Sequence, residues 1–384
     1  MSIFESNPAL RWTVPAVTAV ALVGGGAAVG GLRAIADDGL PARSAAQLLV
    51  DVQQARLDGL SGTVVQKSDL GLPDLPVAGA SGGTGSSDLT SLISGTHTMR
   101  VWFAGPDKAR MALLGTLGES DVIRNGQDVW VWASKEKTAK HYVLPTRDAA
   151  GKSGTSGMPS PTDLPTSPQD AADKALAAIT PSTEVTTSGT ATVAGQPAYE
   201  LVLKPKEATS LVAQVRVAID GTRHVPLRVQ VFAKSVADPV FEVAFSAVDF
   251  ARPDAAQFAF NPPPGTTVTD AKAPAHGPAA DSTTKPVAPQ QNSADMPKVV
   301  GKGWGSVMVA KAPVAAASGS AGATADKSIA QLMKFVALLP KKSGSWGSGH
   351  LMAGTAFSVL LTDDGRLVVG AVTPEGLYAA LAGS

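Results

Sequence analysis

The chain has 384 residues, enough for two domains and the linkers around them. Its 32 basic and 32 acidic side chains give a formal net charge of zero, so no charge excess predicts binding to nucleic acid. The absence of cysteine excludes disulfide bonds, thiolate metal sites, a cysteine nucleophile and lipidation of an N-terminal cysteine.

The N-terminal region contains a long stretch without a charged side chain. It runs from Trp12 to Leu32, close to the ~20 residues that a helix needs to cross a bilayer. We expect residues 1–11 to be cytoplasmic, residues 12–32 to form a single transmembrane anchor, and the bulk of the chain to be extracytoplasmic. Two alternatives stay open: a signal peptide cleaved at Ala36, after the pattern Ala34-Ile35-Ala36, or a buried helix of a soluble domain.

The next predicted element is an amphipathic helix. Ser44 and Gln47 match a capping box, apolar residues follow at helical spacing, and Gly59 ends the segment. The pattern then changes to short runs rich in Val and Trp, separated by Gly, Pro, Asn or Asp. These runs predict strands at 62–66, 96–103, 110–114, 121–124, 128–133 and 140–144. Asn125-Gly126 is typical of a hairpin, for which we expect a type I′ turn.

A second group of strands follows with the same character. Clear alternation from Val215 to Ile219 is typical of a half-buried strand. The group is predicted at 182–193, 196–205, 210–220, 227–233 and 240–249. Two insertions interrupt the strands, at 68–95 and 146–167, and the second leads into a helix predicted at 168–179. Residues 44–268 are therefore predicted to form one mainly antiparallel domain.

The remaining residues differ in composition. Residues 269–297 are rich in Ala, Pro, Ser and Asp and are predicted to be a disordered linker, because they offer little apolar surface to bury. Residues 298–384 are predicted to form a small C-terminal α/β domain. Its elements would be a strand at 303–310, a helix from Asp326, a hairpin around Asp363-Asp364-Gly365 and a last helix from Thr373-Pro374.

No pattern of catalytic residues stands out. The histidines lie in separate segments, without the spacing of a helical metal pair: His97, His141, His224, His276 and His350. There is no nucleophile elbow or phosphate loop, and Gly347 and Gly349 are interpreted as loop residues. We expect no enzymatic activity, no catalytic or metal-ligating residue and no cofactor.

Three stretches of the first domain resemble one family. They are the helix leading into 59–64, the segment 215–220 leading to 226–228, and the run Phe258–Val268 with its Asn-Pro-Pro-Pro-Gly. Together they resemble the LolA-like lipoprotein and lipid carrier superfamily, which includes the N-terminal domain of RseB/MucB-type sigma-factor regulators. The resemblance implies an α+β fold: a curved antiparallel sheet forming an incomplete β-barrel with a helical lid, here followed by the small α/β domain. It also implies an apolar cavity for acyl chains.

On this basis we expect a non-enzymatic binding protein that accepts lipid or the acyl chains of a lipoprotein. The alternative is an RseB-like sensor that binds an anti-sigma factor or a transporter partner. Alternation does not decide which strand face lines the cavity. The chosen cavity wall candidates are Val101, Phe103, Val129, Val131, Val229, Val231, Phe241, Val243 and Phe245, with Trp102, Trp130 and Trp132 on the opposite parity. The lid candidates, which could instead be ordinary core, are Leu48, Val52, Leu72, Leu75, Leu176 and Ile179.

Overall fold

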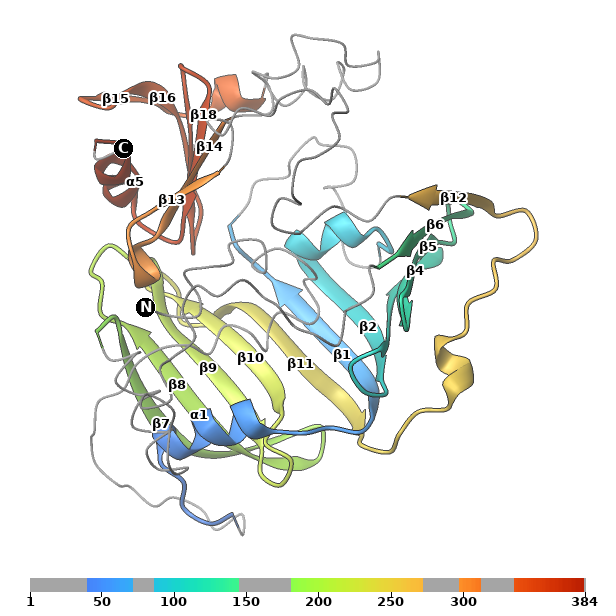
Figure 1. Cartoon of the computed structure of the whole chain (residues 1–384). Helices are drawn as coiled ribbons and strands as arrows, with labels where there is room; N and C mark the ends of the chain where they lie inside the picture. The colour runs from blue at the N-terminus through green and yellow to red at the C-terminus, as the bar shows by residue number, and fades with distance from the viewer. Residues whose placement is uncertain (1–39, 72–85, 145–180, 272–296, 312–334, 383–384) are drawn as a thin grey trace, which may run out of the picture.

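The computed structural model describes residues 40–71, 86–144, 181–271, 297–311 and 335–382 (Figure 1). Several predicted segments lie outside these ranges. They are the stretch 12–32, the lid candidates Leu72 and Leu75, the helix 168–179 with Leu176 and Ile179, most of the linker 269–297, and most of the helix predicted from Asp326.

The described residues form mainly one large sheet that curves without closing (Figure 1). Its 12 strands follow the order β12-β6-β5-β4-β3-β2-β1-β11-β10-β9-β8-β7, so β1 joins two antiparallel meanders. The edge strands β12 and β7 stay apart, which confirms the predicted incomplete barrel. The bounds are β1 Leu60–Ser68, β2 Gly95–Phe103, β3 Lys108–Gly115, β4 Gly118–Asn125, β5 Asp128–Ala133, β6 Thr138–Val143, β7 Thr183–Val193, β8 Gln196–Pro205, β9 Val212–Asp220, β10 Pro226–Ala233, β11 Pro239–Asp249 and β12 Thr267–Ala271.

Local turn chemistry accounts for the hairpins of both meanders. Asn125 pairs with Asp128, so the hairpin loop is Gly126-Gln127. Only Gly126 has a positive φ (67°), which fits a type II′ turn and corrects the expected type I′ geometry. Two successive positive φ values occur instead at Ala194 (49°) and Gly195 (76°), between β7 and β8.

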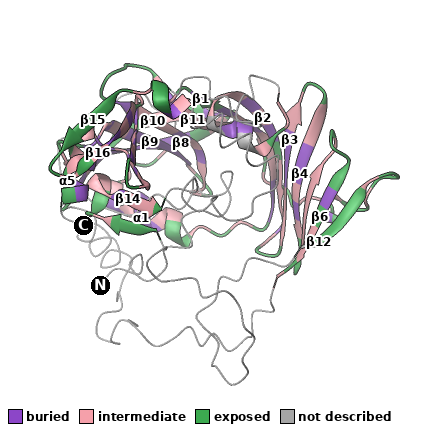
Figure 2. Cartoon of the chain, turned by 90° about the horizontal axis from the view of Figure 1, so that it is seen from above, coloured by how far each residue is buried: buried purple, intermediate pink, exposed green. Residues whose placement is uncertain are grey.

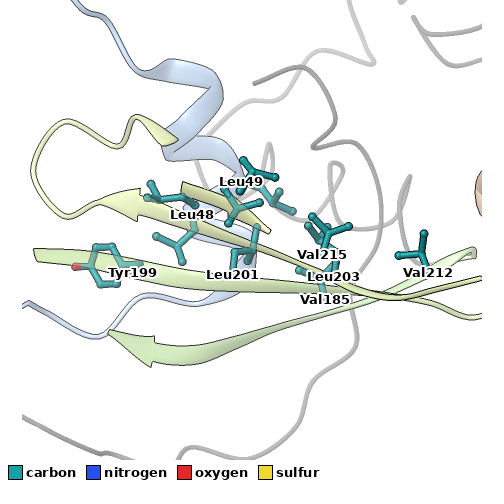
Figure 3. Close-up of a cluster of buried hydrophobic side chains, with 11 residues drawn as sticks. Leu48, Leu49, Val185, Tyr199, Leu201, Leu203, Val212 and Val215 are labelled. Atoms are coloured by element: carbon teal, nitrogen blue, oxygen red, sulfur yellow. The ribbon is translucent and has the colours of Figure 1, made fainter. Parts of the chain in front are cut away.

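Helix α1 (Ala45–Gln54) begins where the sequence predicted it. Ser44 Oγ accepts a hydrogen bond from the Gln47 backbone N–H, and the Gln47 side chain accepts one from the Ser44 N–H, which completes the capping box. Leu48 and Leu49 are 0% and 1% exposed and pack among buried side chains of β7 to β10 (Figure 3). The helix therefore covers one end of the large sheet.

The chain crosses to the other face of the sheet after β11. A short 3₁₀ helix, η5 (Ala255–Phe258), is capped by the Asp254 carboxylate and lies against β3 and β4. Phe258 is 1% exposed. Beyond it, β12 runs parallel to β6, which makes this the one parallel pairing in the large sheet. Sequence patterns did not predict β12.

The C-terminal region has its own sheet and core, as expected for a small α/β unit. Its six strands follow the order β13-β14-β18-β17-β16-β15, and α5 (Pro374–Ala382) packs against β17 through Leu377 and Leu381. Gly347 and Gly349 belong to β16, so their interpretation as loop residues was wrong, and 303–305 is a 3₁₀ turn (η7) rather than strand. The bounds are β13 Lys298–Val300, β14 Val307–Lys311, β15 Lys341–Gly344, β16 Gly347–Ala353, β17 Ser358–Thr362 and β18 Arg366–Gly370.

Hydrogen bonds join the second sheet to the first. Leu211 N donates to Ala371 O (2.9 Å) and Thr373 N donates to Thr209 O (2.8 Å), around a β-bridge between Ser210 and Val372. Trp304 Nε1 donates to Thr183 Oγ1 at 2.7 Å, and its ring packs on the cluster beneath α1. The division into domains at 44–268 and 298–384 therefore stays a prediction, because the two sheets share hydrogen bonds and a hydrophobic cluster.

The expected single-pass membrane location needs correction. Within the described ranges, every helix is too short or too polar to span a bilayer. The stretch 12–32 lies outside those ranges. The structure thus gives no support to the anchoring inferred from the sequence.

Candidate functional site

Cross-strand pairing places the predicted wall residues of β2 and β5 on one face of the large sheet. Directly paired residues of neighbouring strands point to the same side. Val101 pairs with Met111, Met111 with Val122, and Val122 with Val131. A second row of paired residues on the same face runs from Phe103 through Ala109 and Arg124 to Val129. These rows form a continuous strip across β2 to β5.

The candidates of β10 and β11 lie on the same face. Val101 pairs with Gly62 of β1, and alternate β1 residues keep to one side of the sheet. Val64 then pairs with Phe245, and Gln66 with Val243. Across the next strands, Val243 pairs with Val229 and Phe241 with Val231. The structure thus brings together every wall residue that the alternation had grouped.

This shared face is the concave one. Helix α1 packs on it and lies inside the curve of the sheet when the chain is seen from above (Figure 2). The opposite face carries the tryptophans. Phe260 lies 5.2 Å from Trp130 and 6.0 Å from Trp132 between ring centroids, and the Arg110 guanidinium lies 5.2 Å from the Trp102 ring. The segment after β11 therefore covers the tryptophan face and leaves the valine face as the concave wall.

Part of the concave wall is filled by the chain itself. Five wall residues belong to buried clusters or pack against them: Val101, Val229, Val231, Val243 and Phe245. The short helix η3 (Leu89–Ile93) contributes Leu92, 8% exposed, to the cluster around Val64 and Met99. Phe245 also lies close over Gly62, where an added Cβ would stand 2.8 Å from its ring.

Two buried polar side chains of the concave face hold η3 in place. Gln66 is 3% exposed and donates a hydrogen bond to Leu92 O at 2.6 Å. His97 is 2% exposed, and its Nε2 lies 2.7 Å from Ser94 O. Polar residues at these wall positions had no assigned role in the sequence. Their spacing with Val64 on β1 and Met99 on β2 is the signal that could have placed them on this face.

The other part of the wall is only partly buried. Phe103, Val129, Val131 and Phe241 have intermediate exposure, as do Val122 of β4 and Tyr142 of β6. Burial is lower along β6, which has one buried residue, than along β8 and β9, most of whose residues are buried (Figure 2). The β5 and β6 end of the concave wall thus has apolar side chains that are only partly covered, whereas the end under α1 is packed.

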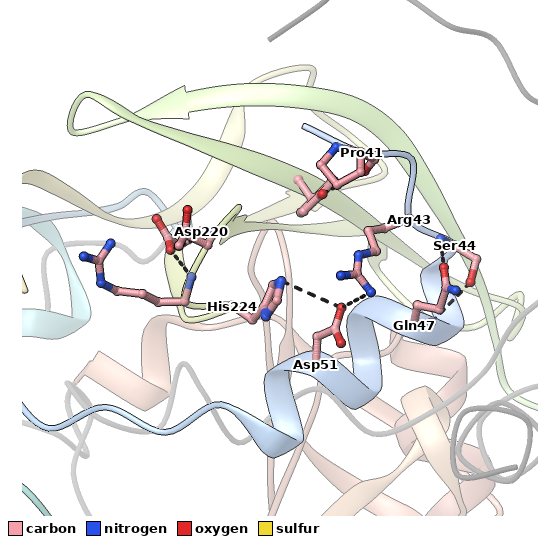
Figure 4. A network of polar contacts seen from close by, with 10 residues as sticks. Pro41, Arg43, Ser44, Gln47, Asp51, Asp220 and His224 are labelled. Carbon is pink, nitrogen blue, oxygen red and sulfur yellow. Dashed lines mark hydrogen bonds and ion pairs between the residues drawn. The ribbon is translucent and has the colours of Figure 1, made fainter. Parts of the chain in front are cut away.

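Polar contacts fasten α1, the first lid candidate. Asp51 Oδ2 lies 3.4 Å from Arg43 Nη1 (Figure 4). The same oxygen lies 3.9 Å from Nε2 of His224, a residue of the turn between β9 and β10. Tyr199 donates a hydrogen bond to Pro41 O at 2.8 Å. With Leu48 fully buried and Val52 packed on the same cluster, the geometry favours a fixed cover over a mobile lid.

Two titratable groups of the large sheet, on the face opposite the concave wall, have shifted pKa values. Burial raises the pKa of Asp121, which is 0% exposed, although its 2.8 Å ion pair with Arg110 opposes the shift. A hydrogen bond with Asp128 (2.8 Å), aided by Asp270 (3.2 Å), raises the pKa of His141. No group of three or more His, Asp or Glu suited to a metal ion occurs among the residues that the structure describes.

Comparison with known proteins gives structural matches only. No protein-family model matches the sequence, and no curated protein matches it either. Among solved structures, the Pseudomonas aeruginosa MucA/MucB complex matches at 15% identity and a TM-score of 0.42, covering 88% of this chain and 96% of that one. An uncharacterized conserved protein from Thermus thermophilus matches at 11% identity and a TM-score of 0.33, covering 59% and 98%.

A LolA superfamily protein from Nitrosomonas europaea also matches, at 10% identity and a TM-score of 0.21, covering 57% of this chain and 99% of that one. The matches include a MucB complex and a LolA superfamily protein. At such identities and TM-scores the likeness carries no argument. The function proposed below therefore rests on this chain's own residues.

Proposed function

We propose that the chain is a non-enzymatic binding protein that accepts an acyl chain of a lipid or lipoprotein on the open part of its concave face. The observation that carries the proposal is the partly buried apolar group at the β5 and β6 end of the concave wall: Val129, Val131 and Tyr142. Val131 ends the row Val101-Met111-Val122-Val131, whose first three residues belong to the η3 cluster or pack against it. The row has no polar side chain across its four strands, so the surface that it leaves free at Val131 is apolar.

The driving force would be burial of apolar surface. Each CH₂ group removed from water contributes about 0.8 kcal/mol, so an alkyl chain needs few polar contacts for useful affinity. Val131 is a sharper test position than Phe245, because Phe245 packs against the η3 cluster and over Gly62. A charge at Phe245 would disturb folding, whereas a charge at Val131 would meet the bound chain.

The test compares Val131→Asp with Leu117→Asp, a matched control in the β3–β4 turn that is 86% exposed. Binding of the neutral probe N-phenyl-1-naphthylamine and thermal unfolding would be measured on the same samples of the full chain. We expect Val131→Asp to weaken probe binding more than tenfold with little change in Tm, and Leu117→Asp to change neither. Wild-type protein that does not bind the probe would overturn the proposal.

A second candidate function is a sensor that reports occupancy to a partner protein such as an anti-sigma factor or a transporter. It is favoured by the backbone hydrogen bonds at Leu211 and Thr373, which join the second sheet to the large one. Hydrogen exchange at these two amides would test it. A sensor predicts that bound acyl probe changes their protection, and unchanged protection at saturation favours a simple carrier.

A further inference from the structure

A pocket of about 460 Å³ lies at one end of the large sheet. Three segments line it: residues 56–58 between α1 and β1, the turn 104–108 between β2 and β3, and Arg252 after β11. The volume falls within the ~300–1,000 Å³ of typical small-molecule sites. Neither the wall nor the lid predictions included any of these residues.

Hydrogen bonds between the lining segments hold the pocket open. The Arg252 guanidinium donates to Asp58 O and to Ala104 O, both at 3.4 Å. Lys108 O accepts from Ala104 N at 2.9 Å, which closes the β2–β3 turn. The Arg252 backbone packs so closely on Gly59 that an added Cβ would stand 2.3 Å from its Cα. The pocket is thus formed before any ligand arrives.

The lining carries an excess of positive charge. Arg56, Lys108 and Arg252 take part in none of the ion pairs between described residues. Of the two lining carboxylates, Asp107 is paired with Arg124 at 3.1 Å. The other lining charges are then the carboxylate of Asp58 and the three cationic side chains. Such a lining favours an anionic group and provides N–H donors for its oxygens.

The pocket lies at one end of the concave wall. The lining turn 104–108 joins the ends of β2 and β3, where Phe103 and Ala109 pair on the concave face, and the lining residue Asp107 pairs with Arg124 of the same row. The side chains therefore become more polar from the row Val101-Met111-Val122-Val131 toward this end of the sheet. We propose that the pocket binds the anionic head group, a carboxylate or phosphate, of an amphipathic ligand whose chain lies on the open concave wall. This inference rests on the proposed acyl site.

The test separates the head group from the chain. Isothermal titration calorimetry of the full chain would compare dodecyl phosphate, dodecan-1-ol and inorganic phosphate. The variant is Arg56→Gln combined with Lys108→Gln. The control is Lys135→Gln, an exposed lysine of the β5–β6 turn, at the opposite end of β5 from the pocket.

We expect wild-type protein to bind dodecyl phosphate at least tenfold tighter than dodecan-1-ol. The double variant should lose at least fivefold of that preference while its affinity for dodecan-1-ol stays the same. Equal affinity of the wild type for both compounds would overturn the head-group pocket and leave the acyl site standing. If the wild-type protein does not bind dodecan-1-ol, the proposed acyl site itself is wrong. Inorganic phosphate binding as tightly as dodecyl phosphate would overturn the amphipathic ligand in favour of a free anion.

Discussion

Replacement of Leu48 by alanine tests whether α1 is a fixed cover or a movable lid. Leu48 is 0% exposed and belongs to the cluster that contains Leu201, Val217 and Val229. Truncating a fully buried leucine costs about 2–5 kcal/mol, the sum of the lost transfer free energy and the cavity left behind. We therefore expect Leu48→Ala to lower the free energy of unfolding by that amount.

Urea unfolding followed by tryptophan fluorescence would measure this loss, with Gln53→Ala as the control. Gln53 is exposed on the same helix, and alanine has high helix propensity, so this change should alter stability by less than ~0.5 kcal/mol. A loss below about 1 kcal/mol for Leu48→Ala would refute the fixed cover. It would mean that α1 leaves the sheet easily, as a lid does.

Three further predictions concern sites away from the concave wall. Arg110→Ala leaves the buried Asp121 carboxylate unpaired and should lower the free energy of unfolding by about 3–5 kcal/mol at pH 7.5. Because burial raises the pKa of Asp121, protonation of this carboxylate should make the loss smaller at pH 5. A loss of stability that does not change with pH would contradict this reasoning. The raised pKa of His141 means that its pairs with Asp128 and Asp270 stabilise the fold below the unfolded pKa, about 6.5, and are lost as pH rises through the higher folded pKa. The wild-type protein should thus be more stable than His141→Gln at pH 6, and the difference in stability should be smaller at pH 9. Chemical unfolding at both pH values measures this difference. A difference that is the same at pH 6 and pH 9 would contradict the prediction. Ala194→Asn should raise stability by a few tenths of a kcal/mol to about 1 kcal/mol in thermal unfolding, because asparagine tolerates the positive φ of 49° better than alanine; a lower Tm would refute the assigned turn strain.

Much of the fold could be read from local patterns. The strands Asp128–Ala133 and Gln196–Pro205 have the bounds that alternation and turn residues predicted, and the capping box at Ser44 placed the start of α1. These features depend on neighbouring residues, so the sequence alone is enough to specify them. Parity within each strand grouped Val129 with Val131, but the common face of Val101, Val131 and Val229 depended on the register between strands.

Other features depended on contacts between distant segments. Alternation defines two faces equally well, and only the tertiary structure decided which face is concave, because α1 packs on the face of Val229 and Phe260 packs on the face of Trp130 and Trp132. The division of the wall into a filled and an open part also required α1 and η3 to be in place.

The same holds for β12 and for the pocket. Strand β12 pairs with β6, from which it is separated by more than a hundred residues. No hairpin turn connects the two strands, so no local sequence pattern indicates the pairing. Arg56, Lys108 and Arg252 come from three separate segments, and each is an ordinary charged residue in its own sequence context. The sequence by itself determined most strands of the large sheet, the start of α1 and the parity within each strand. Only the tertiary structure decided which faces are covered and which charges meet, because those depend on non-local packing that no short window of residues contains.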